Sequence, residues 1–213
     1  MFHQEIERQY ILSTKKENKI RKILKKIGCK KIHDKILYYV IYFYMPNQKG
    51  FLRIREEGKN IITVTRKIFK KNYADESEVK ITHETFENVV KLLRPLIPKN
   101  WNEVKVEKFR EKWNTGPFKL CNEIVIDQWP GLPPYLELDC SNFEELDKFI
   151  KAIGLENEKY FTKGSFDVYM DLYKLKDRSI LFKLSLEFKT IQKVLGKYLD
   201  TNHKKLLKKY CKT

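Results

Sequence analysis

The feature that most constrains the fold of this 213-residue chain is a set of like-charged pairs in segments rich in β-branched and aromatic residues. Side chains at positions i and i+2 of a strand lie on one face of its sheet. Pairs at this spacing, or at twice it in one case, keep one sign within a segment, and acidic and basic pairs come from different segments: Glu5/Glu7, Arg53/Arg55, Glu76/Glu78, Lys108/Arg110, Glu123/Asp127 and Glu137/Asp139. The pattern predicts strands that share a polar face holding both carboxylates and cations.

Two interpretations of that face are open. An alternating charged face is most often the solvated side of a half-buried sheet. On such a surface the signs are usually interspersed, whereas here each segment keeps one sign. If the strands close into a barrel with this face inward, its interior becomes a buried site for a metal ion and phosphate.

The rest of the sequence predicts one α+β domain built mainly from antiparallel strands. Runs of β-branched and aromatic residues predict strands at 32–44, 51–56, 61–68, 77–81, 104–113, 119–127 and 135–140. Helical spacing of apolar residues between cap residues predicts helices at 13–27, 85–96 and 141–153. We expect residues 1–173 to form the domain and residues 174–213 to form a basic, helical C-terminal extension, packed on the domain or trailing from it.

Composition narrows the class of protein. A hydrophobic content of 42% with 13% aromatic residues is typical of a folded chain. No apolar run approaches the ~20 residues that span a bilayer, so we expect a cytoplasmic protein without a membrane span, as a monomer or homodimer. The cysteines are far apart in the sequence, as expected of reduced thiols: Cys29, Cys121, Cys140 and Cys211. The histidines are scattered as well, so we expect no zinc site, and a metal ion here should be bound by oxygen atoms.

Positive charge is concentrated near the C-terminus. The formal net charge is +16, and residues 174–213 hold 12 Lys and Arg against 3 Asp and Glu, which is nine of those sixteen charges. A solvated, solubilising helix is one interpretation of this basic segment. Contact with RNA, DNA or an anionic membrane is the other, because clustered lysines release counterions from phosphate polymers.

Several segments resemble, in order, the motifs of the CYTH family of triphosphate tunnel metalloenzymes. Glu5-Ile6-Glu7-Arg8-Gln9 resembles the E-x-E-x-K strand that defines the family. Residues 51–58 with 64–67 are similar to its arginine hairpin, and residues 76–78 are similar to its next acidic strand. Residues 108–110 are similar to its K-x-R strand, and residues 126–139 are similar to its last acidic hairpin. Lys163-Gly164-Ser165 resembles the start of a lysine-bearing helix near the tunnel mouth, so the resemblance extends from residue 5 to about residue 173.

The resemblance implies a closed, antiparallel eight-stranded β-barrel, the triphosphate tunnel, with flanking helices. It implies a metal-dependent phosphohydrolase that cleaves the terminal phosphate of tripolyphosphate, a nucleoside triphosphate or thiamine triphosphate. Catalytic residues by resemblance are Glu5, Glu7, Asp127 and Lys163. The residues that would bind the triphosphate are Arg53, Arg55, Lys67, Lys108 and Arg110, and those that would bind Mg²⁺ or Mn²⁺ are Glu5, Glu7, Asp127, Glu137 and Asp139.

Two positions depart from the family pattern. Gln9 stands where the first motif has lysine, and Asp139 stands where the last has glutamate. A neutral Gln9 would weaken the stabilisation of charge in the transition state. Gln9 and the basic C-terminal segment therefore favour one alternative, a catalytically weakened module that binds polyphosphate or RNA. The other alternative is a class IV adenylyl cyclase that makes cyclic AMP from ATP, which differs from the triphosphatase in which phosphorus faces the nucleophile.

Overall fold

The computed structural model describes residues 6–58, 61–70, 74–162 and 164–211. Its centre is one antiparallel sheet of eight strands in the order β1-β8-β7-β6-β2-β3-β4-β5. The strands are β1 Ile6–Ile11, β2 Lys31–Tyr44, β3 Gly50–Glu56, β4 Ile61–Phe69, β5 Ala74–Thr82, β6 Asn102–Trp113, β7 Cys121–Gln128 and β8 Tyr135–Cys140. This confirms the predicted α+β class with an antiparallel eight-stranded sheet.

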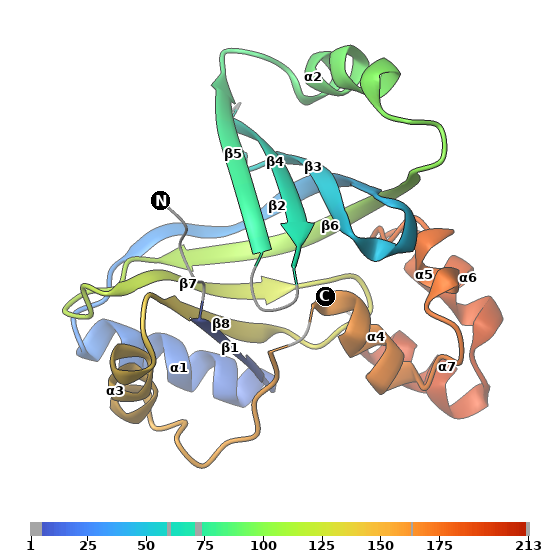
Figure 1. The fold of residues 1–213 in the computed structure, drawn as a ribbon. Coiled ribbons are helices and arrows are strands. Elements are labelled where there is room, and N and C mark those ends of the chain that lie inside the picture. The colour runs from blue at the N-terminus through green and yellow to red at the C-terminus, as the bar shows by residue number, and fades with distance from the viewer. Residues whose placement is uncertain (1–5, 59–60, 71–73, 163, 212–213) are drawn as a thin grey trace.

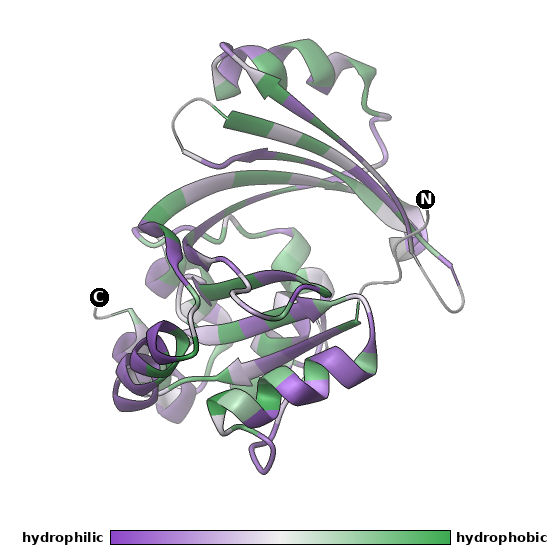
Figure 2. Ribbon diagram, turned by 90° about the vertical axis from the view of Figure 1, so that its left-hand side faces the viewer, coloured by the Kyte–Doolittle hydropathy of each residue, from purple (hydrophilic) through white to green (hydrophobic). Residues whose placement is uncertain are grey.

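The sheet curls into a half-barrel, and the predicted closure of the barrel is wrong for the described residues (Figures 1 and 2). Among the strands of this part of the chain, β1 pairs with β8 alone and β5 with β4 alone, so both are edge strands, and Gln9 of β1 forms an isolated antiparallel bridge with Phe161 on its other side. Both edges carry carboxylates on the same face of the sheet, Glu7 on β1 and Glu76 and Glu78 on β5. Like charges opposite one another disfavour strand pairing, which is a physical reason for the open edge.

The helices that precede residue 154 pack on the outer face of the curled sheet, and those that follow residue 164 pack at one end of it (Figure 1). They are α1 Thr14–Lys26, α2 Phe86–Leu93, α3 Phe143–Ile153, α4 Ser165–Tyr173, α5 Ser179–Phe182, α6 Ile191–Leu195 and α7 Thr201–Tyr210, with 3-10 turns η1 Pro46–Gln48, η2 Arg94–Leu96 and η3 Gly196–Tyr198. The Ser13 side chain accepts from a backbone amide of the first turn of α1, as its sequence predicts; in α3 the cap is Asn142, one residue after the Ser141 of the capping box that the sequence predicts. Gly154, at φ +71°, ends α3.

Apolar side chains on these helices bury the outer face of the sheet. Leu24 of α1 and Phe149 of α3 pack in one cluster with Ile124 and Leu138 of β7 and β8. Over the other half of the sheet, Val89 of α2 belongs to a second cluster with β3 and β4 residues. Where these helices pack, the strands are therefore apolar outward, and the charged side chains line the inside of the curl.

The C-terminal segment docks on one end of the sheet through a third apolar cluster, which contains Leu181, Leu195 and Leu207. Leu186 also forms a parallel bridge with Val106 of β6. In the turn before β8, Gly131 has φ +73°, and a Cβ there would lie 2.5 Å from Cδ1 of Leu207. This close approach requires glycine at that position. The division of the chain at residue 173 stays a prediction.

Two of the four cysteines differ from expectation. Cys121 and Cys140 are opposite each other on β7 and β8 and form a disulfide, so the prediction of reduced thiols is wrong for this pair. Cys29 and Cys211 are free. No helix within the described ranges is long and apolar enough to cross a membrane.

Candidate functional site

Strand register brings the predicted charged residues onto a single face. On β1 and β8, Glu7 lies opposite Asp139, and Gln9 lies opposite Glu137. The same parity continues through the sheet, since Asp127 lies opposite Arg110 on the next pair of strands. Across the remaining strands, this face carries Lys108, Arg53, Arg55, Lys67, Glu76 and Glu78. Sequence spacing predicted a shared face within each strand, and the register extends it over the whole half-barrel.

The centre of this face is a buried ion cluster. Arg110 donates two hydrogen bonds to the two oxygens of Asp127, from Nε and Nη2, both at 2.7 Å. Lys108 Nζ donates to Asp127 Oδ2 at 2.8 Å. The exposed fractions of these side chains are 7% for Lys108, 6% for Arg110 and 1% for Asp127. Such a fork holds Arg110 in a fixed orientation.

Burial and charge oppose each other in this cluster. Burial alone would raise the pKa of Asp127, but the charges of Arg110 and Lys108 outweigh it and lower the pKa to about 2. Burial and the neighbouring charge of Arg110 lower the pKa of Lys108 to about 8, against the attraction of Asp127. Lys108 therefore loses its positive charge at a pH only slightly above the physiological range.

Asp127 is committed to these cations through both of its oxygens. Its predicted roles as a catalytic group and as a metal ligand stay predictions, and these contacts disfavour the role as a metal ligand. Glu123 acts similarly further along β7, accepting from Arg110 Nη1 at 2.8 Å and from Lys112 Nζ at 2.7 Å. Burial would raise the pKa of Glu123, but Arg110 and Lys112 lower it to about 2. Both carboxylates thus position cations.

The facing wall, formed by β3, β4 and β5, holds a second group of cations. Arg53 Nη2 donates to Thr65 Oγ1 at 3.0 Å and to Glu78 Oε2 at 3.3 Å. Arg55 Nε donates to Thr63 Oγ1 at 3.2 Å, and its Nη2 contacts Glu57. Lys67 Nζ lies 2.8 Å from Glu76 Oε2. These side chains keep 13% to 21% of their surface exposed, so a ligand inside the curl can reach them.

Carboxylates cluster where β1 meets β8. Gln9 Nε2 donates to Glu137 Oε2 at 3.0 Å and to Glu7 Oε2 at 3.3 Å, while its buried Oε1 accepts no hydrogen bond. Burial raises the pKa of Glu137 to about 8, against the attraction of Arg110 and with repulsion from Asp127 and Glu7. Asp139 accepts from Asn122 Nδ2 at 3.3 Å. Gln9 thus occupies the place where a lysine would bridge the two glutamates.

Two predicted catalytic residues, Glu5 and Lys163, lie outside the described residues. Within the ranges that the structure describes, no group of three or more His, Cys, Asp or Glu side chains is close enough to hold a metal ion. The carboxylates Glu7, Glu137 and Asp139 nevertheless lie at neighbouring positions of β1 and β8. Oxygen donors of this kind suit Mg²⁺ or Mn²⁺, which binds through one or two carboxylates together with substrate phosphate.

Sequence reasoning missed several members of this face. Thr63 is fully buried and hydrogen-bonds Arg55 and Glu57, and Lys112 pairs with Glu123. Tyr38 lies opposite Lys108, whose ammonium is 5.9 Å from the ring centroid. The signal for Thr63 and Lys112 is parity, since they lie two residues from Thr65 and Arg110.

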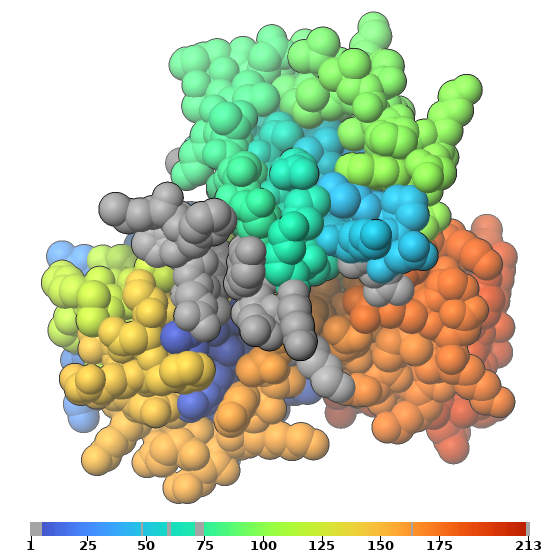
Figure 3. Space-filling model, in the orientation of Figure 1, coloured from blue at the N-terminus to red at the C-terminus, as the bar shows by residue number. Residues whose placement is uncertain are grey.

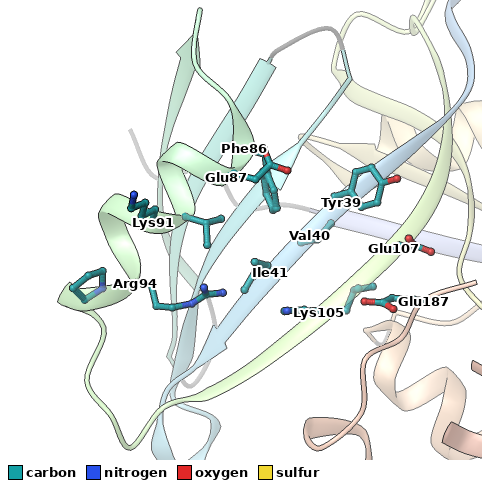
Figure 4. A pocket seen from close by; sticks show the side chains of 13 residues that line it. Tyr39, Val40, Ile41, Phe86, Glu87, Lys91, Arg94, Lys105, Glu107 and Glu187 are labelled. Carbon is teal, nitrogen blue, oxygen red and sulfur yellow. The ribbon is translucent and has the colours of Figure 1, made fainter. Parts of the chain in front are cut away.

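The groove drawn in Figure 4 lies away from these residues. It has a volume of about 510 Å³ and lies between α2 and the outer face of β2 and β6. Tyr39, Ile41 and Phe86 line it together with Lys105 and Glu187. None of the predicted site residues contributes to it.

Comparisons with known proteins agree with this arrangement of the fold. The model of the CYTH domain family matches residues 3–165. Among solved structures, the PH1012 protein of Pyrococcus horikoshii OT3 is 19% identical, with a TM-score of 0.56, and the match covers 75% of this chain and 96% of that one. The HpAC1 protein of Hippeastrum, described as an adenylyl cyclase candidate with a dominant triphosphatase activity, is 13% identical, with a TM-score of 0.51 over 78% and 94% of the two chains.

A third similar structure is a protein of Bacillus halodurans described as an adenylate cyclase candidate, which is 16% identical with a TM-score of 0.53. That match covers 78% of this chain and 97% of the other. No curated protein sequence matches the chain significantly. At these sequence identities the solved structures establish only the fold of the chain, so its substrate must be inferred from its own residues.

Proposed function

Since the chain belongs to the CYTH domain family, we propose that its polar concave face binds a triphosphate with Mg²⁺ or Mn²⁺ and hydrolyses the terminal phosphate. The substrate is inorganic tripolyphosphate or an organic triphosphate such as a nucleoside or thiamine triphosphate.

The observation that carries this proposal is the division of charge across the half-barrel. Cations come from two walls, Arg53, Arg55 and Lys67 from β3 and β4 and Lys108 and Arg110 from β6. Carboxylates gather at the β1 and β8 edge, where Glu7 lies opposite Asp139. A triphosphate is a chain of anions, so cations on two sides can bind its length while the carboxylates hold a metal ion against its end.

Glu7, Glu137 and Asp139, with Glu5 as the next residue of the same strand parity, are the proposed metal ligands. Mg²⁺ or Mn²⁺ held there would neutralise charge on the phosphate oxygens and lower the pKa of a coordinated water. Arg53, Arg55 and Lys67 would bind the phosphates, and Lys108 and Arg110 would stabilise the negative charge that grows during transfer. Asp127 would hold Lys108 and Arg110 in place, as its contacts indicate.

Gln9 favours a second candidate, a catalytically weakened module that binds a triphosphate without fast turnover. The amide contacts Glu7 and Glu137 and contributes no charge. A class IV adenylyl cyclase, which would cleave at the α-phosphate of ATP, is the alternative with turnover, in keeping with how the Bacillus halodurans protein is described.

A substrate panel tests the proposal. We would assay phosphate, pyrophosphate and cyclic AMP from tripolyphosphate, ATP and thiamine triphosphate with Mg²⁺ and with Mn²⁺. If the protein is a triphosphatase, phosphate release should be lost in Glu7→Gln and in Arg53→Ala and kept in the exposed control Glu156→Gln. Cyclic AMP as the main product would establish the cyclase, and binding without any turnover would establish the weakened module.

A further inference from the structure

A second basic site lies in the C-terminal segment, away from the concave face. Between α6 with η3 and α7, the surface has a hollow of about 410 Å³. Figure 1 places α6 and α7 at the end of the sheet beyond β6, and Figure 3 shows the C-terminal helices as one lobe on that side.

Four lysines surround this hollow. Lys193 and Lys197 come from α6 and η3, Lys204 and Lys208 come from α7, and all four side chains are exposed. Within α7, Lys204 and Lys208 have the i, i+4 spacing at which like charges on a helix repel and reduce its stability. Throughout the described residues, no carboxylate forms an ion pair with any of the four, and Asp200, at the start of α7, is engaged with His203.

The helices that carry these lysines are held firmly. Leu195 and Leu207 are buried in the core cluster, and Leu207 packs against Gly131 in the turn before β8. Gly196 is buried at the base of the hollow, where an added Cβ would meet no atom within 4 Å. The two lysine pairs are therefore presented on a fixed framework, which lowers the entropy lost when a ligand binds.

The chemistry of the lining selects the ligand. Besides the lysines, the described residues that line it are Gln192, Gly196 and Leu207, and these include no carboxylate for a cation and no aromatic ring for stacking a base. Lysine binds phosphate as a point charge, and binding to single-stranded nucleic acid combines such charges with aromatic stacking. We propose that this hollow binds a chain of linked inorganic phosphates, as a polyphosphate site separate from the concave face.

A matched pair of variants tests this site. Lys204→Gln/Lys208→Gln removes two charges from the hollow, and Lys205→Gln/Lys209→Gln removes two charges from the same helix at residues outside the lining. Both have the same composition and net charge. We would measure binding of medium-chain sodium polyphosphate by calorimetry in EDTA. We expect the first variant to lose about tenfold in affinity for one class of sites and the control to lose less than about twofold.

A charge-preserving variant supplies an independent check. Gly196→Met fills the hollow without altering any lysine, and it should weaken the same class of sites, with circular dichroism reporting whether the fold is kept. Equal losses in the two double variants would overturn the proposal, because they would show a diffuse basic surface. Tighter binding of a single-stranded RNA oligonucleotide than of polyphosphate at this site would overturn it as well.

The concave face is monitored separately. Hydrolysis of tripolyphosphate with Mg²⁺ should be the same in the Lys204→Gln/Lys208→Gln variant as in the native chain. Absence of turnover in every form would refute the proposed triphosphatase and leave the polyphosphate measurement intact. Loss of polyphosphate binding in Arg53→Ala in place of the lysine variant would instead assign all binding to the concave face and overturn the second site.

Discussion

Replacing Glu137 with glutamine should change how the stability of the protein depends on pH. The Glu137 side chain is 18% exposed, and its carboxyl lies 3.5 Å from Arg110 and accepts a 3.0 Å hydrogen bond from Gln9. Burial raises its pKa from 4.5 to about 8, despite the attraction of Arg110. Ionisation of this carboxyl therefore opposes folding when no metal is bound.

The sign follows from proton binding. Between pH 4.5 and about 8 the folded chain keeps the Glu137 proton while the unfolded chain has lost it, so the free energy of unfolding falls as pH rises. The lowered pKa values of Glu123 and Asp127 act below this window. The lowered pKa of Lys108 acts between about 8 and 10.5, above the window. From pH 5 to about pH 7, below the range in which Lys108 loses its proton, the pH dependence of this cluster therefore comes from Glu137.

The magnitude can be bounded. A rise in pKa from 4.5 to about 8 corresponds to at most about 5 kcal/mol, at about 1.4 kcal/mol for each pKa unit. Since part of the side chain is exposed and water screens the charge, we expect a loss of about 2 kcal/mol between pH 5 and pH 8. Glu137→Gln carries no ionisable group there and should lack this loss.

Urea denaturation at pH 5, 6, 7 and 8 in EDTA would measure the effect. Glu137→Gln should match the native chain at pH 5 and exceed its stability by about 2 kcal/mol at pH 8. The control Glu156→Gln, at an exposed position, should follow the native chain at each pH. A difference between Glu137→Gln and the native chain that stays constant across this range would refute the reasoning.

Three further outcomes are expected. Gln9→Lys places a cation beside Glu7 and Glu137 and should raise tripolyphosphate turnover about tenfold in a phosphate-release assay, so an unchanged rate would contradict the role given to this position. Arg110→Lys loses the fork to Asp127 and should lower the free energy of unfolding by about 2 kcal/mol in urea titrations, whereas no loss would contradict the buried ion cluster. Gly131→Ala forces a Cβ toward Leu207 at positive φ and should cost about 2 kcal/mol, whereas Gly164→Ala, at the N-cap of α4 with open space around it, should cost less than about 1 kcal/mol, and equal effects would contradict this account.

The fold was predictable where local pattern decides it. The aromatic and β-branched run at 32–44 became β2, whose bounds are Lys31–Tyr44, and the capped helix at 141–153 became α3. Closure of the barrel depends instead on whether β1 meets β5, two strands far apart in the sequence that have no local signal for pairing. The disulfide is a similar case, because Cys121 and Cys140 become neighbours only through the register of β7 and β8.

The sequence predicted which charged side chains lie on one face of the sheet, but it did not predict the hydrogen bonds and ion pairs among them. Spacing put Lys108 and Arg110 on one side of β6, and the strand register shows both meeting Asp127 of β7. Sequence spacing does not predict that Arg110 donates hydrogen bonds to both Asp127 and Glu123, because that depends on the distance between β6 and β7. The raised pKa of Glu137 likewise arises from burial beside Glu7 and Asp127, which are on two other strands.

The network implies an order in which cations meet a triphosphate. Ion pairs on the β3, β4 and β5 wall are part-exposed: the exposed fractions are 17% and 31% for Arg53 and Glu78, and exposed pairs contribute about 0–1 kcal/mol. The pair of Arg110 and Asp127 is 6% and 1% exposed, and breaking such a buried pair costs about 3–5 kcal/mol. Under the proposed function, an incoming phosphate would therefore exchange with Glu78 for Arg53 at little cost, whereas Arg110 would stay bound to Asp127. Initial binding would then depend on the β3–β5 wall, and the β6 cations would contribute a charge field that is in place before the reaction begins.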